Sequence, residues 1–149
     1  MHELYGKESA LSQFKDKCSE HGLKVTPQRT AIYEELWRSK EHPTADLIYR
    51  KVRKKLPNIS FDTVNRTLIT LSRLGTISIV EGYGEAKRFD PDLEPHHHFR
   101  CIRCNSIVDF EEKTFDEINI PKNISKQFIV LHKKIVLEGV CETCQKRKE

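Results

Sequence analysis

Hydrophobic positions in the first half of the chain recur at helical spacing, in four segments separated by breaks. The first segment covers residues 10–22 and ends at Gly22. Each later segment starts at a residue that can cap a helix, namely Thr26 before Pro27, then Thr44, then Ser60 or Asp62. The pattern predicts four helices, of which the last covers residues 60–74.

After Gly75 the spacing of the apolar positions changes from helical to strand-like. Ile77, Ile79 and Val80 predict a strand, residues 82–84 a turn, and residues 86–89 a returning strand. Helices followed by such a hairpin are typical of a winged helix-turn-helix. In that fold the helix over residues 60–74 is the one that enters the major groove of DNA.

The second half is shorter and less regular. Residues 90–95 contain two prolines and three acids, which indicates a hinge. Beyond it, residues 99–102 and 107–110 predict two strands, residues 115–120 a short helix, and two apolar runs within residues 128–140 further strands. We expect fold class α+β, with a winged-helix domain over residues 1–90 and a small α/β domain over residues 96–149.

Composition and charge narrow the class of protein. The chain has 149 residues, of which 37% are hydrophobic, and no apolar run approaches the ~20 residues of a membrane helix. Its polar start resembles no secretion signal, so we expect a cytoplasmic protein. Residues 1–90 carry 16 basic and 12 acidic side chains, whereas the remainder carries ten of each. The excess predicts a polyanion partner for the N-terminal half.

Four of the five cysteines form two Cys-x-x-Cys pairs. Each pair lets two thiolates face one ion from a tight turn, and two pairs complete a tetrahedral site of the kind that zinc prefers. We expect Zn²⁺ in a structural role, held by Cys101, Cys104, Cys141 and Cys144. Two redox disulfides are the alternative, and Cys18 belongs on a buried helix face.

A second set of donors precedes the first cysteine pair. In a strand, His96 and His98 point to one face and His97 to the other. Asp109 lies on the partner strand, and Asp90 and His42 come earlier in the chain. Imidazoles with carboxylates suit Fe²⁺ or Mn²⁺. Spacing alone leaves open a solvated histidine loop, and a helix-capping role for His42.

Seven stretches together resemble the ferric uptake regulator family, from about residue 23 to residue 144. They are residues 23–29 (LKVTPQR), 42–45 (HPTA), 59–68, 87–90 (KRFD), the histidines at 96–98 and the two cysteine pairs, the second of which follows Gly139-Val140. The resemblance implies a homodimeric, metal-responsive repressor that binds double-stranded operator DNA. It also implies a dimerisation role for residues 96–149.

The resemblance further assigns the regulatory metal ligands. They are implied to be His42, Asp90, His96, His98 and Asp109, with Fe²⁺ or Mn²⁺ as the ion. Aspartate at positions 90 and 109 resembles the peroxide-sensing branch of the family, in which hydrogen peroxide leads to oxidation of a ligand histidine, here His42 or His96. A repressor that answers to iron or zinc levels remains the alternative.

DNA contacts are expected from six residues, namely Lys24, Gln28, Arg29, Thr63, Asn65 and Arg66. The family usually has tyrosine where this chain has Asn65. Asparagine can bond adenine bidentately in the major groove, whereas a tyrosine ring offers apolar contact, so the operator can differ from the family's usual one. The basic side chains of residues 50–55 either bind phosphate or form a solvated helix face.

Members of the family can carry another metal site. Its positions here are His97, His132 and Asp116 or Glu117, but Pro95 stands where a further ligand histidine is expected.

We expect no enzymatic activity. A small metallohydrolase is a distant alternative, because mixed histidine and aspartate ligation can activate water. No separate general acid or base, and no substrate site, is apparent in the sequence. A zinc-ribbon adaptor that does not bind DNA is a third possibility, against which the basic N-terminal half and its capped helices argue.

Overall fold

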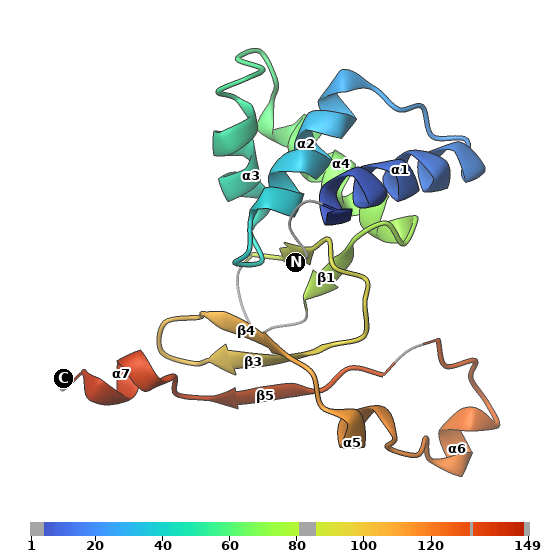
Figure 1. Ribbon diagram of the computed structural model, residues 1–149, viewed down its shortest axis with the longest axis vertical. Helices are drawn as coiled ribbons and strands as arrows, with labels where there is room; N and C mark the ends of the chain where they lie inside the picture. Colours follow the sequence, from blue (N-terminus) through green and yellow to red (C-terminus); the bar gives the residue numbers. More distant parts are fainter. Residues whose placement is uncertain (1–4, 81–85, 132, 148–149) are drawn as a thin grey trace. The chain divides into compact units, whose positions relative to one another are not determined.

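The structure is a computed structural model that describes residues 5–80, 86–131 and 133–147. It divides into two compact units, residues 1–93 and residues 94–149, each of which is described separately below. Figure 1 labels most of their elements. Helices and sheets both occur, which confirms the expected α+β class. Within the described residues no helix has the length and apolar character needed to cross a bilayer.

The first unit contains four helices and a two-stranded sheet. Its elements are α1 (Tyr5–Glu20), α2 (Pro27–Arg38), α3 (Ala45–Val52), α4 (Phe61–Arg73), β1 (Ser78–Val80) and β2 (Arg88–Asp90). The two strands pair antiparallel, with Ile79 opposite Phe89. The predicted turn at residues 82–84 lies outside the described residues.

Side-chain caps determine where the later helices start. Thr26, Thr44 and Ser60 each accept a hydrogen bond from the backbone N–H three residues on, as the sequence predicts. The sequence allows either Ser60 or Asp62 as the cap of α4. In the structure Ser60 is the cap, and its Oγ lies 3.1 Å from the nitrogen of Thr63. After α4, Gly75 has a φ of 75°, a backbone conformation that favours glycine and ends the helix.

One apolar core holds the first unit together. It includes Phe14 and Cys18 from α1, Ile32 and Leu36 from α2, Ile48 and Val52 from α3, and Val64, Leu68 and Leu71 from α4, with Phe89 from β2. The Phe14 and Tyr33 rings stack with centroids 4.3 Å apart. The core fixes α4 on α2 and α3, and leaves the polar face of α4 for other uses.

The second unit is a three-stranded sheet with short helices. Its elements are β3 (His97–Cys101), β4 (Ile107–Phe110), α5 (Lys113–Asp116), α6 (Lys122–Ser125), β5 (Val136–Gly139) and α7 (Glu142–Lys146). Strand β3 is central, antiparallel to β4 and parallel to β5. Among residues 94–131 and 133–147, the only hydrophobic side chains that are buried are those of Cys101 and Cys144. Apolar packing therefore contributes little to this unit.

Two predictions for the second unit are wrong. The helix expected over residues 115–120 lies at Lys113–Asp116, because Glu112 caps it by accepting from the N–H of Thr114. The apolar run at residues 128–131 is no strand, and only the later run forms β5. Strand β3 pairs with β4 on one edge and with residues 136–139 on the other, so neither edge is left for residues 128–131.

Candidate metal centres and nucleic-acid interface

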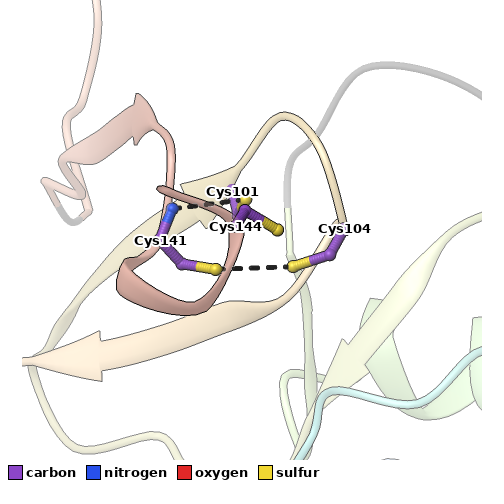
Figure 2. A group of neighbouring side chains, drawn as sticks. All are labelled: Cys101, Cys104, Cys141 and Cys144. Carbon is purple, nitrogen blue, oxygen red and sulfur yellow. Dashed lines mark hydrogen bonds between the residues drawn. The ribbon is translucent and has the colours of Figure 1, made fainter. Parts of the chain in front are cut away.

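The four paired cysteines lie together at one end of the second unit (Figure 2). Their Sγ atoms are all within 4.8 Å of one another, and those of Cys104 and Cys141 are 3.7 Å apart. Ligands held about 2.3 Å from one zinc ion in a tetrahedron are about 3.8 Å apart. A disulfide requires sulfurs about 2.05 Å apart, and all five cysteines are free thiols. The geometry fits a tetrahedral metal site.

Two thiols of this cluster have pKa values that are displaced in opposite directions. The backbone N–H of Cys141 lies 3.4 Å from Sγ of Cys101 and lowers the pKa of the Cys101 thiol to about 6. The hydrogen bond with Cys141 raises the pKa of the Cys144 thiol to about 12. Four thiolates this close repel one another, and a bound dication removes that repulsion. The donor set therefore suits a divalent ion.

His42 and Asp90 lie together in the first unit. Nδ1 of His42 is 3.7 Å from Oδ2 of Asp90, the last residue of β2. His42 has a φ of 51°, which is unusual for a residue with a side chain and costs roughly 1–2 kcal/mol. Neighbouring hydrogen bonds must offset this cost.

Arg88 supplies those bonds. Its Nε donates to the carbonyl oxygen of His42 at 2.6 Å, and its Nη2 donates to the carbonyl oxygen of Glu41. The backbone N–H of Phe89 donates to the carbonyl of Pro43 at 3.0 Å. Strand β2 thus holds the loop that carries His42 and also carries Asp90. In the sequence Arg88 stands out only as part of the motif at residues 87–90, and its role in holding this loop was not predicted.

His96, His98 and Asp109 form a second set, within the second unit. His98 and Asp109 are opposite each other in the β3–β4 register, and His96 lies two residues before His98. Nε2 of His96 is 3.0 Å from Nε2 of His98, which is 3.3 Å from Oδ1 of Asp109. Two ligand atoms about 2.1 Å from one ion, at a right angle, are about 3.0 Å apart. The three groups therefore fit a shared ion.

The tautomer of His96 also suits a ligand. Its Nδ1 lies 2.6 Å from the carbonyl oxygen of Glu94, which can only accept a hydrogen bond. The proton must therefore be on Nδ1, and Nε2 presents its lone pair. Metal-bound histidines commonly make this kind of hydrogen bond to a backbone carbonyl.

The positions considered for another metal site are only partly brought together. Nε2 of His97 is 2.8 Å from Oδ1 of Asp116. Glu117 is exposed at the end of α5 and His132 lies outside the described residues. Within the described part of the chain, no group of three or more possible ligands includes His97, Asp116 or Glu117.

Four of the six expected DNA-contact residues line one pocket of the first unit. Gln28 and Arg29 come from the start of α2, and Thr63 and Arg66 from the start of α4. The other lining residues are Leu23, Thr26, Thr67 and Thr70. Thr67 and Thr70 were missed, although their spacing from Thr63 places all three on one face of the helix. Asn65 is half-buried and does not line the pocket, and the carbonyl of Lys24 accepts from Arg29 at 2.5 Å.

Several basic side chains at residues 50–55 have partners within the first unit. Arg50 pairs with Asp46 at 3.0 Å, and Lys55 with the nearly buried Glu35 at 3.0 Å. Lys51 donates to Oγ of Ser39 at 2.9 Å. These contacts favour a structural role for this basic face over phosphate binding.

Comparisons with known proteins agree with these features. The family model described as "Ferric uptake regulator family" matches residues 20–138. A peroxide operon regulator of Bacillus subtilis (strain 168) is 37% identical over 139 residues, which cover 93% of this chain and 95% of that protein. A peroxide-responsive repressor of Staphylococcus epidermidis is 36% identical over 124 residues, 83% of each chain.

A solved structure has the same fold over nearly the whole length. It is the ferric uptake regulator of Helicobacter pylori, described as having three functional metal binding sites. Its TM-score is 0.75 at 25% identity, with 95% of each chain covered. With the family match over most of the residues, these findings show that the chain belongs to the ferric uptake regulator family of metal-dependent transcriptional repressors.

Proposed function

We propose that this chain is a homodimeric repressor that binds operator DNA when loaded with Fe²⁺ or Mn²⁺ and senses hydrogen peroxide through oxidation of a ligand histidine. The observation that carries the proposal is the convergence of His96, His98 and Asp109 around a common point. The resemblance to repressors named for their response to peroxide is the reason for proposing hydrogen peroxide as the signal.

The proposal includes two kinds of metal site, one structural and one regulatory. Cys101, Cys104, Cys141 and Cys144 hold Zn²⁺, and a site closed by four thiolates has no position for substrate, so its role is structural. His42, Asp90, His96, His98 and Asp109 hold the regulatory ion. Nitrogen and oxygen donors suit Fe²⁺ and Mn²⁺ better than thiolates do.

The regulatory ligands come from both units, which is the basis for switching. If donors from residues 1–93 and residues 94–149 bind one ion, they fix the angle between the two units. In a dimer this angle sets the spacing of the two α4 helices, and operator half-sites accept only certain spacings. A shift from about 1% to 99% DNA-competent protein needs ~5.5 kcal/mol of differential metal affinity.

Peroxide would reverse this switch by removing a ligand. A bound Fe²⁺ ion would supply the redox chemistry by which hydrogen peroxide oxidises a neighbouring imidazole, with one peroxide oxygen added to a ring carbon and the other leaving as water. Oxygen added to the ring of His42 or His96 makes that side chain a poorer donor, so the ligand set loses a member. Mn²⁺ does not readily support this redox chemistry, so the manganese-loaded protein would stay bound to DNA.

Helix α4 reads the operator in this proposal. Arg66 is exposed and pairs with Asp62 at 2.5 Å, a surface interaction that a phosphate or a base can displace at little cost. Arg29 and Gln28 face the same pocket from α2. Asn65 replaces the family's usual tyrosine, and we expect it to shift base preference toward a bidentate adenine contact.

A repressor that responds to metal levels is the second candidate. The fold shared with a ferric uptake regulator of Helicobacter pylori favours it. Its expected behaviour differs in one respect, because peroxide would neither modify a histidine nor release DNA.

The decisive experiment measures operator binding before and after low peroxide. The operator is first selected from random DNA, and the protein is loaded with zinc plus either Fe²⁺ or Mn²⁺. Loss of binding by the Fe²⁺ form alone, together with one added oxygen on the peptide containing His42 or His96, supports peroxide sensing. If both forms stay bound and unmodified, the protein senses metal level.

Substitutions of ligand residues, compared with a control substitution, distinguish the loss of a ligand from a general loss of structure. His42→Ala and Asp90→Ala should abolish metal-dependent binding and retain the zinc, whereas His21→Ala, at an exposed position in the first unit, should change neither. Undiminished metal-dependent binding by both ligand variants would contradict the regulatory site.

A further inference from the structure

His97 lies between two proposed metal ligands but faces the other side of β3. Its ring is almost fully buried, with the rings of Phe110 and Phe115 at 5.7 and 5.6 Å between centroids. Both of its nitrogens are engaged. Nδ1 lies 3.1 Å from the backbone nitrogen of Ile135, and Nε2 lies 2.8 Å from Oδ1 of Asp116.

The partner of Nδ1 determines the tautomer of His97. The backbone N–H of Ile135 can only donate, so Nδ1 accepts and carries no proton. In a neutral ring the proton is then on Nε2, where it is donated to Asp116. A metal ion at Nε2 would require removal of this proton and an imidazolate ring. His96 has the opposite arrangement, with the proton on Nδ1 and the lone pair on Nε2.

Asp116 is itself held in place by a third segment. Nζ of Lys133 donates to the backbone carbonyls of Asp116 and Ile118, the latter at 2.7 Å, at the end of α5. His97 therefore links three parts of the second unit: β3, the backbone just before β5, and α5. Such a link holds α5 on the side of β3 that carries His97.

We propose that His97 and Asp116 form a hydrogen-bonded positioning pair, and not a metal site, which holds His96 and His98 on the opposite side of β3 in their ligand orientation. The effect on His96 and His98 rests on the proposed function, whereas the tautomer of His97 does not. Groups hydrogen-bonded directly to metal ligands commonly contribute 10–100-fold to metal affinity, and because this pair acts through the backbone of β3, its effect should lie at the lower end of that range.

The test compares three substitutions in the zinc-loaded full chain. Asp116→Asn keeps an oxygen that accepts from Nε2–H, so Mn²⁺ affinity should stay within about threefold of wild type. Asp116→Ala removes the acceptor and should weaken Mn²⁺ binding about tenfold. Glu117→Ala, the neighbouring acidic position, should have no effect.

Metal counts and NMR distinguish a positioning pair from a ligand pair. We expect two ions per chain, one zinc and one manganese, in the wild type and in all three variants. Long-range ¹H–¹⁵N spectra, assigned with His97→Gln, should show Nε2 protonated and Nδ1 unprotonated. Three ions in the wild type, with one lost in Asp116→Asn or Glu117→Ala, would overturn the proposal, as would a His97 ring protonated on Nδ1.

The same measurements separate this proposal from the proposed function. If the wild type binds no ion beyond zinc, the regulatory site fails, and the NMR tautomer still decides the state of His97. If Mn²⁺ binds and Asp116→Ala leaves its affinity unchanged, the positioning role fails while the regulatory site stands.

Discussion

Individual residues near the proposed regulatory ligands hold the backbone or the ring of a ligand residue in place. Arg88 bonds the carbonyl oxygens on either side of the left-handed residue His42, and the carbonyl of Glu94 fixes the proton of His96. None of these hydrogen bonds involves an atom that is proposed to bind the ion. The precision of the ligand set therefore depends on residues that never touch the ion.

Arg88→Ala tests this dependence. Loss of its hydrogen bonds to the loop at residues 41–42 frees a strained backbone, so we expect Mn²⁺ affinity to fall about tenfold and unfolding free energy to fall by about 1–2 kcal/mol. Calorimetric titration and urea unfolding measure the two effects. Lys87→Ala, at the exposed neighbouring position, is the control. Equal affinity in both variants would mean that His42 needs no such support.

Glu35 provides a test of electrostatics in the first unit. Burial raises the pKa of its carboxyl, but hydrogen bonds and charge from Lys55 and Arg38, at 3.0 and 2.8 Å, outweigh this, so the pKa lies below 4.5. A lowered folded pKa means stability that is complete above the unfolded pKa and is lost as the pH falls through the folded value.

Glu35→Gln should therefore destabilise the first unit by about 1 kcal/mol at pH 7, and the difference should shrink as the pH falls below 4.5. Urea unfolding followed by fluorescence of the single tryptophan, Trp37 in α2, reports on this unit. Glu34→Gln, which removes only a surface pair with Arg38 at 3.8 Å, should cost less than about 0.5 kcal/mol. A pH-independent difference would contradict the ionic origin.

At the scale of elements, sequence patterns predicted the first unit well and the second unit poorly. Local signals were strong in the first unit, where Thr26, Thr44 and Ser60 are caps that act over three residues. The second unit depends on pairing between distant segments. Whether residues 128–131 or 136–139 join β3 is decided by register, which no local pattern contains.

The candidate sites also differ in how far the sequence predicted them. The Cys-x-x-Cys spacing predicted the four-cysteine cluster, because the motif itself forms the knuckle. The role of His97 could not be predicted, since it depends on a backbone N–H at residue 135 and on where α5 ends. Tautomers are properties of the folded environment.

Removal of one zinc ligand should unfold the second unit alone. With so little buried apolar surface there, Cys104→Ser is expected to lose zinc and the β3–β5 sheet while Trp37 still reports cooperative unfolding of the first unit. Metal analysis and two-dimensional NMR measure both effects. Cys18→Ala, in the core of the first unit, should retain its zinc. A folded sheet in Cys104→Ser without zinc would contradict this role.

At the scale of the whole molecule, the proposed dimer needs a surface on which two copies meet. Residues 128–131 present consecutive apolar side chains, with Ile129 91% and Leu131 80% exposed in the single chain. Contiguous exposed apolar side chains are a feature of protein–protein interfaces.

Leu131→Asp should shift the dimer toward monomer, because a charge would be buried at the interface. Sedimentation equilibrium measures the shift, and operator affinity should fall with it, since each half-site needs one copy. Lys126→Asp, at an exposed position just before the apolar run, is the charged control. A dimer of unchanged strength in Leu131→Asp would place the interface elsewhere.

The scarcity of apolar packing in the second unit has a consequence for the lifetime of the protein in the cell. A domain whose fold depends on one ion becomes a substrate for proteases when that ion is withdrawn or its thiolates are oxidised. Repressor abundance would then follow zinc supply and thiol redox state, independently of the histidine-based signal. We expect pulse-chase half-life to shorten under zinc chelation, and the genes under its control to be released even without peroxide.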